Sequence, residues 1–101
     1  MAVYVDKAAW WWRGKYWCHL TADSLAELHE FAAKVGCQRA WFQEPPKTPY
    51  PHYDLTEGKR ALALTRGAQE LLDRKAFIEK VRKLRLEWNQ EKEATSEPPQ
   101  D

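Results

Sequence analysis

The order of hydrophobic and polar residues divides the chain into short strands and amphipathic helices. In residues 2–5, β-branched and aromatic side chains alternate between two faces, which is typical of a strand. Residues 38–43 alternate in the same way, so we expect a second strand there and a shorter third strand at 68–72. A tryptophan-rich loop is expected after the first strand and a proline-rich loop after the second.

Capping residues and apolar stripes indicate three helices. The first begins at Ser24, because Ser24 and Glu27 form an S-x-x-E capping box. The second is expected between the N-cap residue Thr56 and Gly67, and the third begins after Asp73. Apolar side chains recur on one helical face: Leu25, Leu28, Ala32 and Val35 in the first helix, and Phe77, Val81, Leu84 and Trp88 in the third.

This alternation of elements predicts one α/β domain over residues 1–93, followed by a disordered polar tail at 94–101. We expect a small, three-stranded, mainly parallel sheet with about three helices, similar to half of a Rossmann fold. Right-handed crossovers would then bring the loops that follow the strands to one edge of the sheet. The tryptophan-rich loop, the proline-rich loop and the residues after it would meet there in a single cleft.

Composition narrows the class of protein. The chain has 101 residues and a net charge of +1, from 16 Lys and Arg against 15 Asp and Glu, which argues against binding of duplex nucleic acid by bulk charge. The sequence has neither a signal peptide nor an apolar run of about 18 residues, so we expect a cytoplasmic protein with no membrane partner. Cys18 and Cys37 are expected to be buried, reduced thiols, and a disulfide between them is the alternative.

Candidate chemistry is concentrated in residues 10–23, W-W-W-R-G-K-Y-W-C-H-L-T-A-D. Three consecutive tryptophans cannot all face one core, because neighbouring side chains point in different directions. Aromatic faces stack on planar ligands, and cations beside them hold phosphates. Alternatively, the tryptophans fill the core or join two copies of the chain in a homo-oligomer. On the first interpretation, this stretch supplies five ligand-binding residues: Trp12, Arg13, Lys15, Trp17 and His19.

The proline-rich segment, residues 44–51, leads directly into His52-Tyr53-Asp54. In an extended chain His52 and Asp54 point to the same side with their Cα atoms about 7 Å apart, which suits a shared ligand or metal ion. In the alternative, Tyr53 packs inward and the polar pair caps the next helix. We expect all three residues to belong to the ligand site. The proline-rich segment would act as a lid or, in the alternative, as a rigid spacer.

Three further residues complete the predicted ligand site. Lys59 and Arg60 lie in the first turns of the second helix, where cations oppose the helix dipole unless an anion binds nearby. Solvated surface positions are the alternative for both residues. Trp41, in the expected second strand, adds one more ring for stacking.

Several motifs resemble those of a bacterial and phage family known as domain of unknown function 4031. They are M-A-V-Y-V-D at the start, W-C-H-L-T-A-D-S-L-A-E-L-H-E-F-A at 17–32, H-Y-D-L at 52–55 and the pair Gly67-Ala68. The resemblance covers roughly residues 1–85 and implies no established activity. It implies a small cytosolic protein, in the host cytoplasm when a phage encodes it, and makes a role against host defence conceivable.

Three kinds of function fit these residues, and we favour the first. It is a non-catalytic binding module, without a cofactor, for a phosphorylated, nucleotide-like small molecule, which would let a phage protein sequester a signalling nucleotide. The second is a metal-dependent phosphoesterase or nuclease, in which Asp6, Asp54 and His52 would surround Mg²⁺ or Mn²⁺. His19 or His52 would serve there as general base or ligand. The third is a protein-interaction module that uses the tryptophans and the basic third helix.

Overall fold

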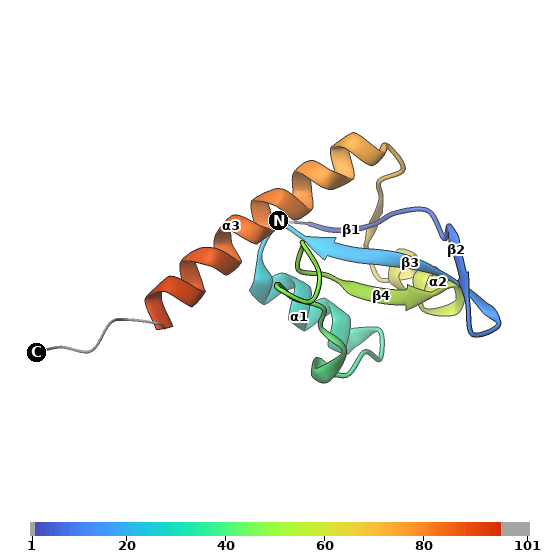
Figure 1. Ribbon diagram of the computed structural model, residues 1–101. Helices are drawn as coiled ribbons and strands as arrows, with labels where there is room; N and C mark the ends of the chain where they lie inside the picture. The colour runs from blue at the N-terminus through green and yellow to red at the C-terminus, as the bar shows by residue number, and fades with distance from the viewer. Residues whose placement is uncertain (1, 96–101) are drawn as a thin grey trace, which may run out of the picture.

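The computed structural model describes residues 2–95, which form an α/β fold with three α-helices and a five-stranded mixed sheet. In Figure 1 the sheet lies between α3 and α1. The elements in chain order are β1 (Val3–Val5), β2 (Trp10–Trp12), β3 (Lys15–Ala22), α1 (Leu25–Lys34), the short 3₁₀ helix η1 (Arg39–Trp41), β4 (Tyr53–Thr56), α2 (Glu57–Thr65), β5 (Gln69–Glu70) and α3 (Arg74–Thr95).

The sheet is built around β3, the longest strand. Antiparallel partners lie on both of its edges, β1 and β2 on one and β4 on the other, because Leu20 pairs with both Val5 and Tyr53. Among the described strands, β1 with β5 is the one parallel pair. The expected three-stranded, mainly parallel sheet is therefore wrong in strand number and direction, although the α/β class is confirmed.

The tryptophan-rich stretch accounts for much of this difference, because it is a β-hairpin and not a loop. Arg13 and Gly14, with φ angles of 49° and 76°, form the two-residue turn between β2 and β3. Positive φ at both central positions is typical of the type I′ turn, whose twist suits an antiparallel pair. A turn of this length joins antiparallel strands directly, whereas a parallel pair needs a long crossover.

The strand expected at residues 38–43 is also wrong. A single turn of 3₁₀ helix, η1, occupies half of it, and Gln43 alone forms an isolated bridge with His52. The alternation was misleading because Trp41 is 44% exposed and belongs to no sheet face. The strand that does enter the sheet is β4, where Tyr53 and Leu55 are buried.

The helices agree with their predicted caps. Ser24 accepts a hydrogen bond from the backbone N–H of Glu27, and its hydroxyl donates one to the Glu27 carboxylate. Thr56 accepts from the N–H of Lys59 at the start of α2, and Asp73 accepts from the N–H of Lys75 at the start of α3. The expected tail lies outside the described residues from 96 onward, and residues 94 and 95 are the last of α3.

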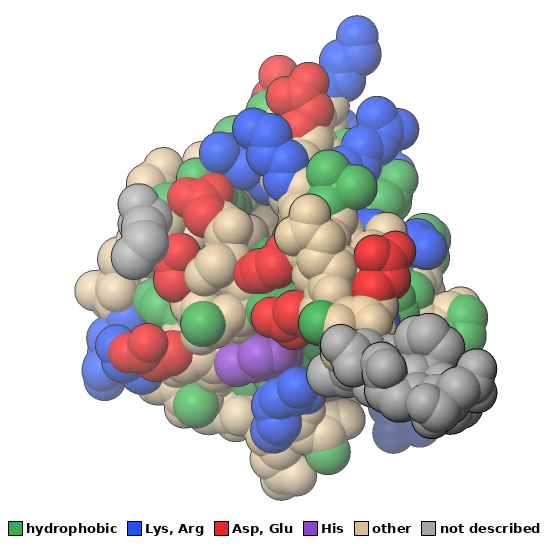
Figure 2. All heavy atoms as spheres, turned by 90° about the vertical axis from the view of Figure 1, so that its left-hand side faces the viewer, with side chains coloured by type: hydrophobic (Ala, Val, Ile, Leu, Met, Phe, Trp, Pro, Cys, Tyr) green, Lys and Arg blue, Asp and Glu red, His purple; other side chains and the backbone are tan. Residues whose placement is uncertain are grey.

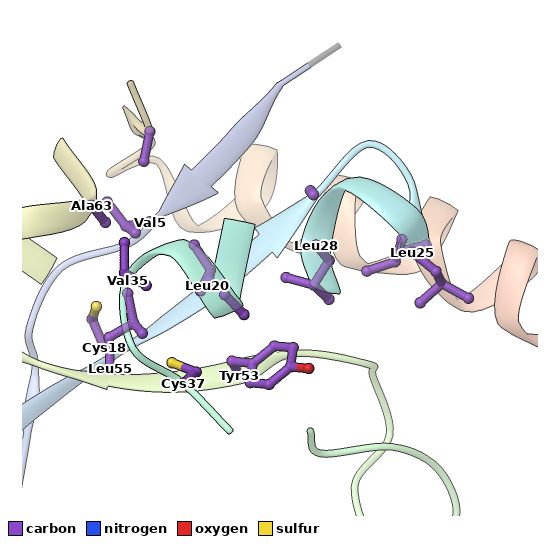
Figure 3. Packing of buried hydrophobic residues seen from close by; sticks show 14 residues of the cluster. Val5, Cys18, Leu20, Leu25, Leu28, Val35, Cys37, Tyr53, Leu55 and Ala63 are labelled. Atoms are coloured by element: carbon purple, nitrogen blue, oxygen red, sulfur yellow. The ribbon is translucent and has the colours of Figure 1, made fainter. Parts of the chain in front are cut away.

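The two faces of the sheet have different partners. One face packs on α1 and α2 and forms the main core, where Figure 3 shows Leu20, Tyr53 and Leu55 among the helix side chains. On the other face Tyr4 packs against Phe77 and Val81 of α3. Because α3 covers only part of this second face, side chains further along β3 and β4 remain accessible.

The surface carries charges of both signs. Figure 2 shows basic and acidic side chains interspersed on one side of the molecule, in keeping with the net charge of +1. Among the described helices, none combines the length and the apolar character that a membrane crossing requires.

Candidate metal centre and its cleft

A bulge between β1 and β2 places the first functional side chain. Val5 pairs with Leu20 and Trp10 pairs with Trp17, so the four residues 6–9 lie opposite only two residues of β3. Such bulges bend a strand and redirect its side chains, and they are frequent beside active sites. Here the bulge turns the Asp6 carboxylate toward β3. Its Oδ1 accepts from the backbone N–H of His19 at 2.7 Å, and its Oδ2 lies 2.7 Å from His19 Nδ1.

The register between β3 and β4 brings three more side chains together. His19 is paired directly with Asp54, so the two side chains share one face of the sheet. His52 lies two residues before Asp54 and therefore points to the same side. Its Nε2 lies 3.1 Å from Asp54 Oδ1, and the ring centroids of His19 and His52 are 5.0 Å apart.

Both imidazole rings are held through Nδ1. His19 Nδ1 faces the Asp6 carboxylate, and His52 Nδ1 donates to the backbone carbonyl of Tyr50 at 2.8 Å. Partners of this kind fix the tautomer and orientation of metal-binding histidines, because they leave Nε2 as the free nitrogen. One potential ligand atom from each of His19, His52 and Asp54 lies within 4.8 Å of the other two. We call these three residues the metal cluster.

The charges around the metal cluster favour a cation. Asp54 Oδ1 is a buried oxygen that accepts no hydrogen bond from the described part of the chain, and His52 Nε2 lies 3.1 Å from it. Burial disfavours the charged form of His52, but the Asp54 carboxylate and the Tyr50 carbonyl outweigh this and raise the pKa of His52 above its ordinary value. A metal ion at this point would satisfy the buried oxygen and replace the proton on Nε2.

Two residues of the metal cluster, His19 and His52, line a cleft of about 350 Å³, and Asp54 lies behind them outside its lining. Asp6, His19 and His52 supply its polar side, while α3 and the proline-rich segment supply apolar walls that include Phe77 and Pro49. Two cations, Lys7 from the bulge and Arg74 from α3, also line it. A cleft of this size and character can hold a small ligand that has an apolar part and an anionic part.

The proline-rich segment is hydrogen-bonded to α3. Arg85 donates to the carbonyl of Pro49 at 2.6 Å, and Arg82 donates to the Tyr50 hydroxyl at 3.4 Å. Thr48, Pro49 and Tyr50 line the cleft, so the segment forms one of its walls.

The structure brings only part of the predicted ligand site together. His19, His52 and Asp54 meet, whereas Tyr53 points to the opposite face of the sheet, where its hydroxyl lies 2.9 Å from His29 Nδ1 in the core. The inward packing that was the alternative for Tyr53 is therefore what the structure has. The hairpin residues of the predicted site lie away from the cleft, toward the turn: Trp12, Arg13, Lys15 and Trp17.

Lys59 and Arg60 contact oxygens of the protein itself. Lys59 Nζ lies 3.4 Å from the carbonyls of Val35 and Gly36 at the end of α1, and 5.9 Å from the centre of the Trp41 ring. Arg60 donates to the carbonyl of Asp6 at 2.8 Å and pairs with Glu70. These contacts explain cations early in α2 without a bound anion, and neither residue lines the cleft.

Two cations that line the cleft, Lys7 and Arg74, are absent from the predicted site. Trp10 is absent from it too, although its ring packs against that of His19 with 4.6 Å between centroids. Lys7 comes from the bulge and Arg74 from α3, which are far apart in sequence, so no local motif signals that they line one cleft. The tryptophan-rich composition did point to Trp10, but not to its orientation.

The sequence model of a family described as "Protein of unknown function (DUF4031)" matches residues 3–83. The chain belongs to this family. The matched range holds Asp6, the metal cluster and the part of α3 that lines the cleft, so the whole candidate site lies within the family's domain. Searches of the curated proteins and of the solved structures gave no match.

Proposed function

We propose that the cleft binds a divalent transition metal at the metal cluster and hydrolyses a phosphorylated, nucleotide-like ester beside it. The observation that carries this proposal is the grouping of two imidazoles and a carboxylate within 4.8 Å, with both Nδ1 atoms already engaged. Catalytic zinc sites use three protein ligands of these types and leave one position open.

The ligand types favour zinc or a similar ion over the Mg²⁺ that the sequence suggests. Imidazole nitrogen suits Zn, Fe, Ni and Cu, whereas Mg²⁺ prefers oxygen ligands. The roles within the predicted set also change. Asp6 is held by His19 and acts as a positioning residue, and His19 takes its place beside His52 and Asp54 as a ligand.

The proposed reaction consumes one water. A zinc ion held by His19, His52 and Asp54 would supply a water whose pKa is near 7 and would polarise a phosphoryl oxygen. The water oxygen forms a bond to phosphorus, and the bond from phosphorus to the leaving oxygen breaks. One proton of the water ends on the leaving oxygen, and the other stays with the product phosphate. Lys7 and Arg74 offset the negative charge of the phosphate, while Phe77 contacts the apolar part of the ligand.

Binding without turnover is the second candidate, and one observation favours it. The carboxylate of Asp6 is engaged by His19, and no other Asp or Glu from the described residues lines the cleft, so a free carboxylate base is missing. The same cleft would then retain a phosphorylated small molecule through the metal without cleaving it.

A hydrolysis assay separates the two candidates. Chelator-treated protein is supplied with zinc, manganese or magnesium and given bis(p-nitrophenyl) phosphate. We expect nitrophenol release with zinc, and its loss in His19→Ala and His52→Ala but not in the control His29→Gln, which alters a histidine outside the cleft. Zinc-dependent stabilisation without release would favour the binding module, since a ligand at 100 times its Kd adds about 2.7 kcal/mol of stability. If zinc neither stabilises the protein nor supports release, the proposal is wrong.

A further inference from the structure

An aromatic strip leads away from the metal cluster along the sheet. Trp10 pairs with Trp17 and Trp12 pairs with Lys15, and alternate residues of a strand share a face. The side chains of Trp10, Trp12 and Trp17 therefore lie on the same face as His19. Trp10 contacts the His19 ring, and the rings of Trp12 and Trp17 are 5.6 Å apart.

This strip ends in exposed rings and cations at the hairpin turn. Trp12 is 51% exposed, and the Arg13 guanidinium lies 4.4 Å from the centre of its ring. Lys15 stands across the strand pair from Trp12. Lys15 lies four positions before His19 on β3, so their Cα atoms are about 13 Å apart.

On the other side of the cleft a basic groove runs along α3. A second hollow of about 410 Å³ lies next to the cleft, since Arg74 and Ile78 line both. Lys75, Glu79 and Arg82 complete its lining, which gives three cations and one acid. From Arg74 to Arg82 the helix rises about 12 Å.

We infer that a single-stranded nucleic acid crosses this face, from the α3 groove over the metal cluster to the tryptophan strip. This inference rests on the proposed function and names its substrate class as a single-stranded polynucleotide rather than a free nucleotide. Proteins that hold single strands combine a cationic groove for the backbone with aromatic rings on which bases stack. Here the cations lie on α3 and the indole rings lie on β2 and β3, and the strip alone extends about 13 Å along the strand beyond His19, so one nucleotide would not span both.

Single strands fit this face better than a duplex. The indole rings need unstacked bases, which a duplex keeps inside its helix. The net charge of +1 also gives little of the bulk attraction on which duplex binding depends.

Fluorescence anisotropy with labelled 12-nucleotide DNA and RNA strands tests the inference, with a duplex of the same length and adenosine monophosphate as competitors. We expect the single strands to bind at least tenfold more tightly than either competitor. Trp12→Ala, and the double variant Arg74→Ala with Arg82→Ala, should each weaken binding at least fivefold. Trp41→Ala is the matched control, because Trp41 is an exposed tryptophan beside Lys59 and outside this face. Tighter binding of the RNA strand than of the DNA strand would indicate that the protein contacts the 2′-hydroxyl groups.

The salt dependence provides a second readout. Each phosphate contact on a single strand contributes a slope of about 0.7 in log affinity against log salt, so the double variant should lower the slope by about 1.4 while Trp12→Ala leaves it unchanged. Equal affinity of wild type and both test variants, or tighter binding of the monophosphate, would overturn the inference.

The outcomes also separate this inference from the proposed function. Zinc-dependent release from bis(p-nitrophenyl) phosphate without strand binding would overturn the inference and leave the proposed function standing. Strand binding that needs Trp12 and the two arginines, with no zinc-dependent hydrolysis, would support single-strand binding across this face and contradict the proposed hydrolysis. Melting curves of the variants verify that each is folded.

Discussion

At the scale of single residues, Asp6 has the most specialised role. Its two oxygens contact two different groups of the same residue, the backbone N–H and Nδ1 of His19. Its backbone carbonyl accepts from Arg60, which anchors the bulge independently of the carboxylate. The carboxylate therefore contacts His19 alone. Its replacement should change the orientation and tautomer of the His19 ring without unfolding the bulge.

Asp6→Asn should weaken zinc binding by about 10–100-fold, the usual cost of losing a partner that orients a metal-binding histidine. The amide cannot match the carboxylate in fixing the tautomer of His19. A competition titration against a zinc-binding dye measures the effect, with Glu30→Gln on the exposed face of α1 as control. An Asp6→Asn protein with wild-type zinc affinity would show that Asp6 has no positioning role.

His29 is a residue whose place the sequence does not reveal. It packs edge-on against Phe42 and lies 2.9 Å from the Tyr53 hydroxyl, and burial together with Arg39 lowers its pKa below the ordinary 6.5. As the pH falls below about 6.5, the unfolded chain takes up a proton before the folded protein does. Stability linked to His29 is therefore present above pH 6.5 and lost as the pH falls toward the lower, folded pKa.

Urea unfolding of the metal-free protein at pH 7.5 and pH 5.5 measures this loss. Wild type should lose more unfolding free energy between the two values than His29→Gln does. The remaining histidines are common to both proteins, so their contributions cancel in the comparison. Equal losses in the two proteins would mean that His29 titrates at its ordinary pKa in the fold.

At the scale of elements, the helices were predictable and the sheet was not. Capping pairs such as Ser24 with Glu27 and apolar stripes such as that of α1 are local, so the sequence displays them directly. The pairing of His19 with Asp54 joins residues 35 positions apart. Residues 38–43 have the alternating pattern of a strand but do not form one. Strand order depends on such distant contacts, which no short pattern encodes.

The hairpin turn provides a test at this scale. Gly14→Ala should destabilise the protein by about 1 kcal/mol, because an L side chain at a φ of 76° is strained although space is open around it. Gly58 lies inside α2, also in open space, and Gly58→Ala should instead stabilise by roughly 0.5 kcal/mol through helix propensity. Urea midpoints of the two variants should move in opposite directions, and a shift in the same direction would contradict the turn assignment.

At the scale of the whole molecule, the expected single cleft forms in part. The bulge, the proline-rich segment and His52 do meet, because the bulge lies beside β3 while the segment and His52 lead into β4, the strand paired with β3. The hairpin turn lies at the far end of β3, so its residues join the site only as an extension across the face. Sequence reasoning found His52 and Asp54, which are close in the chain. It gave His19 a general ligand role, since its neighbour across the sheet was unknown.

The central claim is that His19, His52 and Asp54 hold one metal ion, and anomalous diffraction at the zinc edge from crystals of zinc-loaded protein tests it most directly. We predict one peak at the cluster, about 2.0–2.2 Å from a nitrogen of each histidine and an oxygen of Asp54. Crystals of His19→Ala grown under the same conditions should lack that peak. A zinc-loaded crystal with no peak at the cluster, or with zinc bound by other residues alone, would contradict the claim.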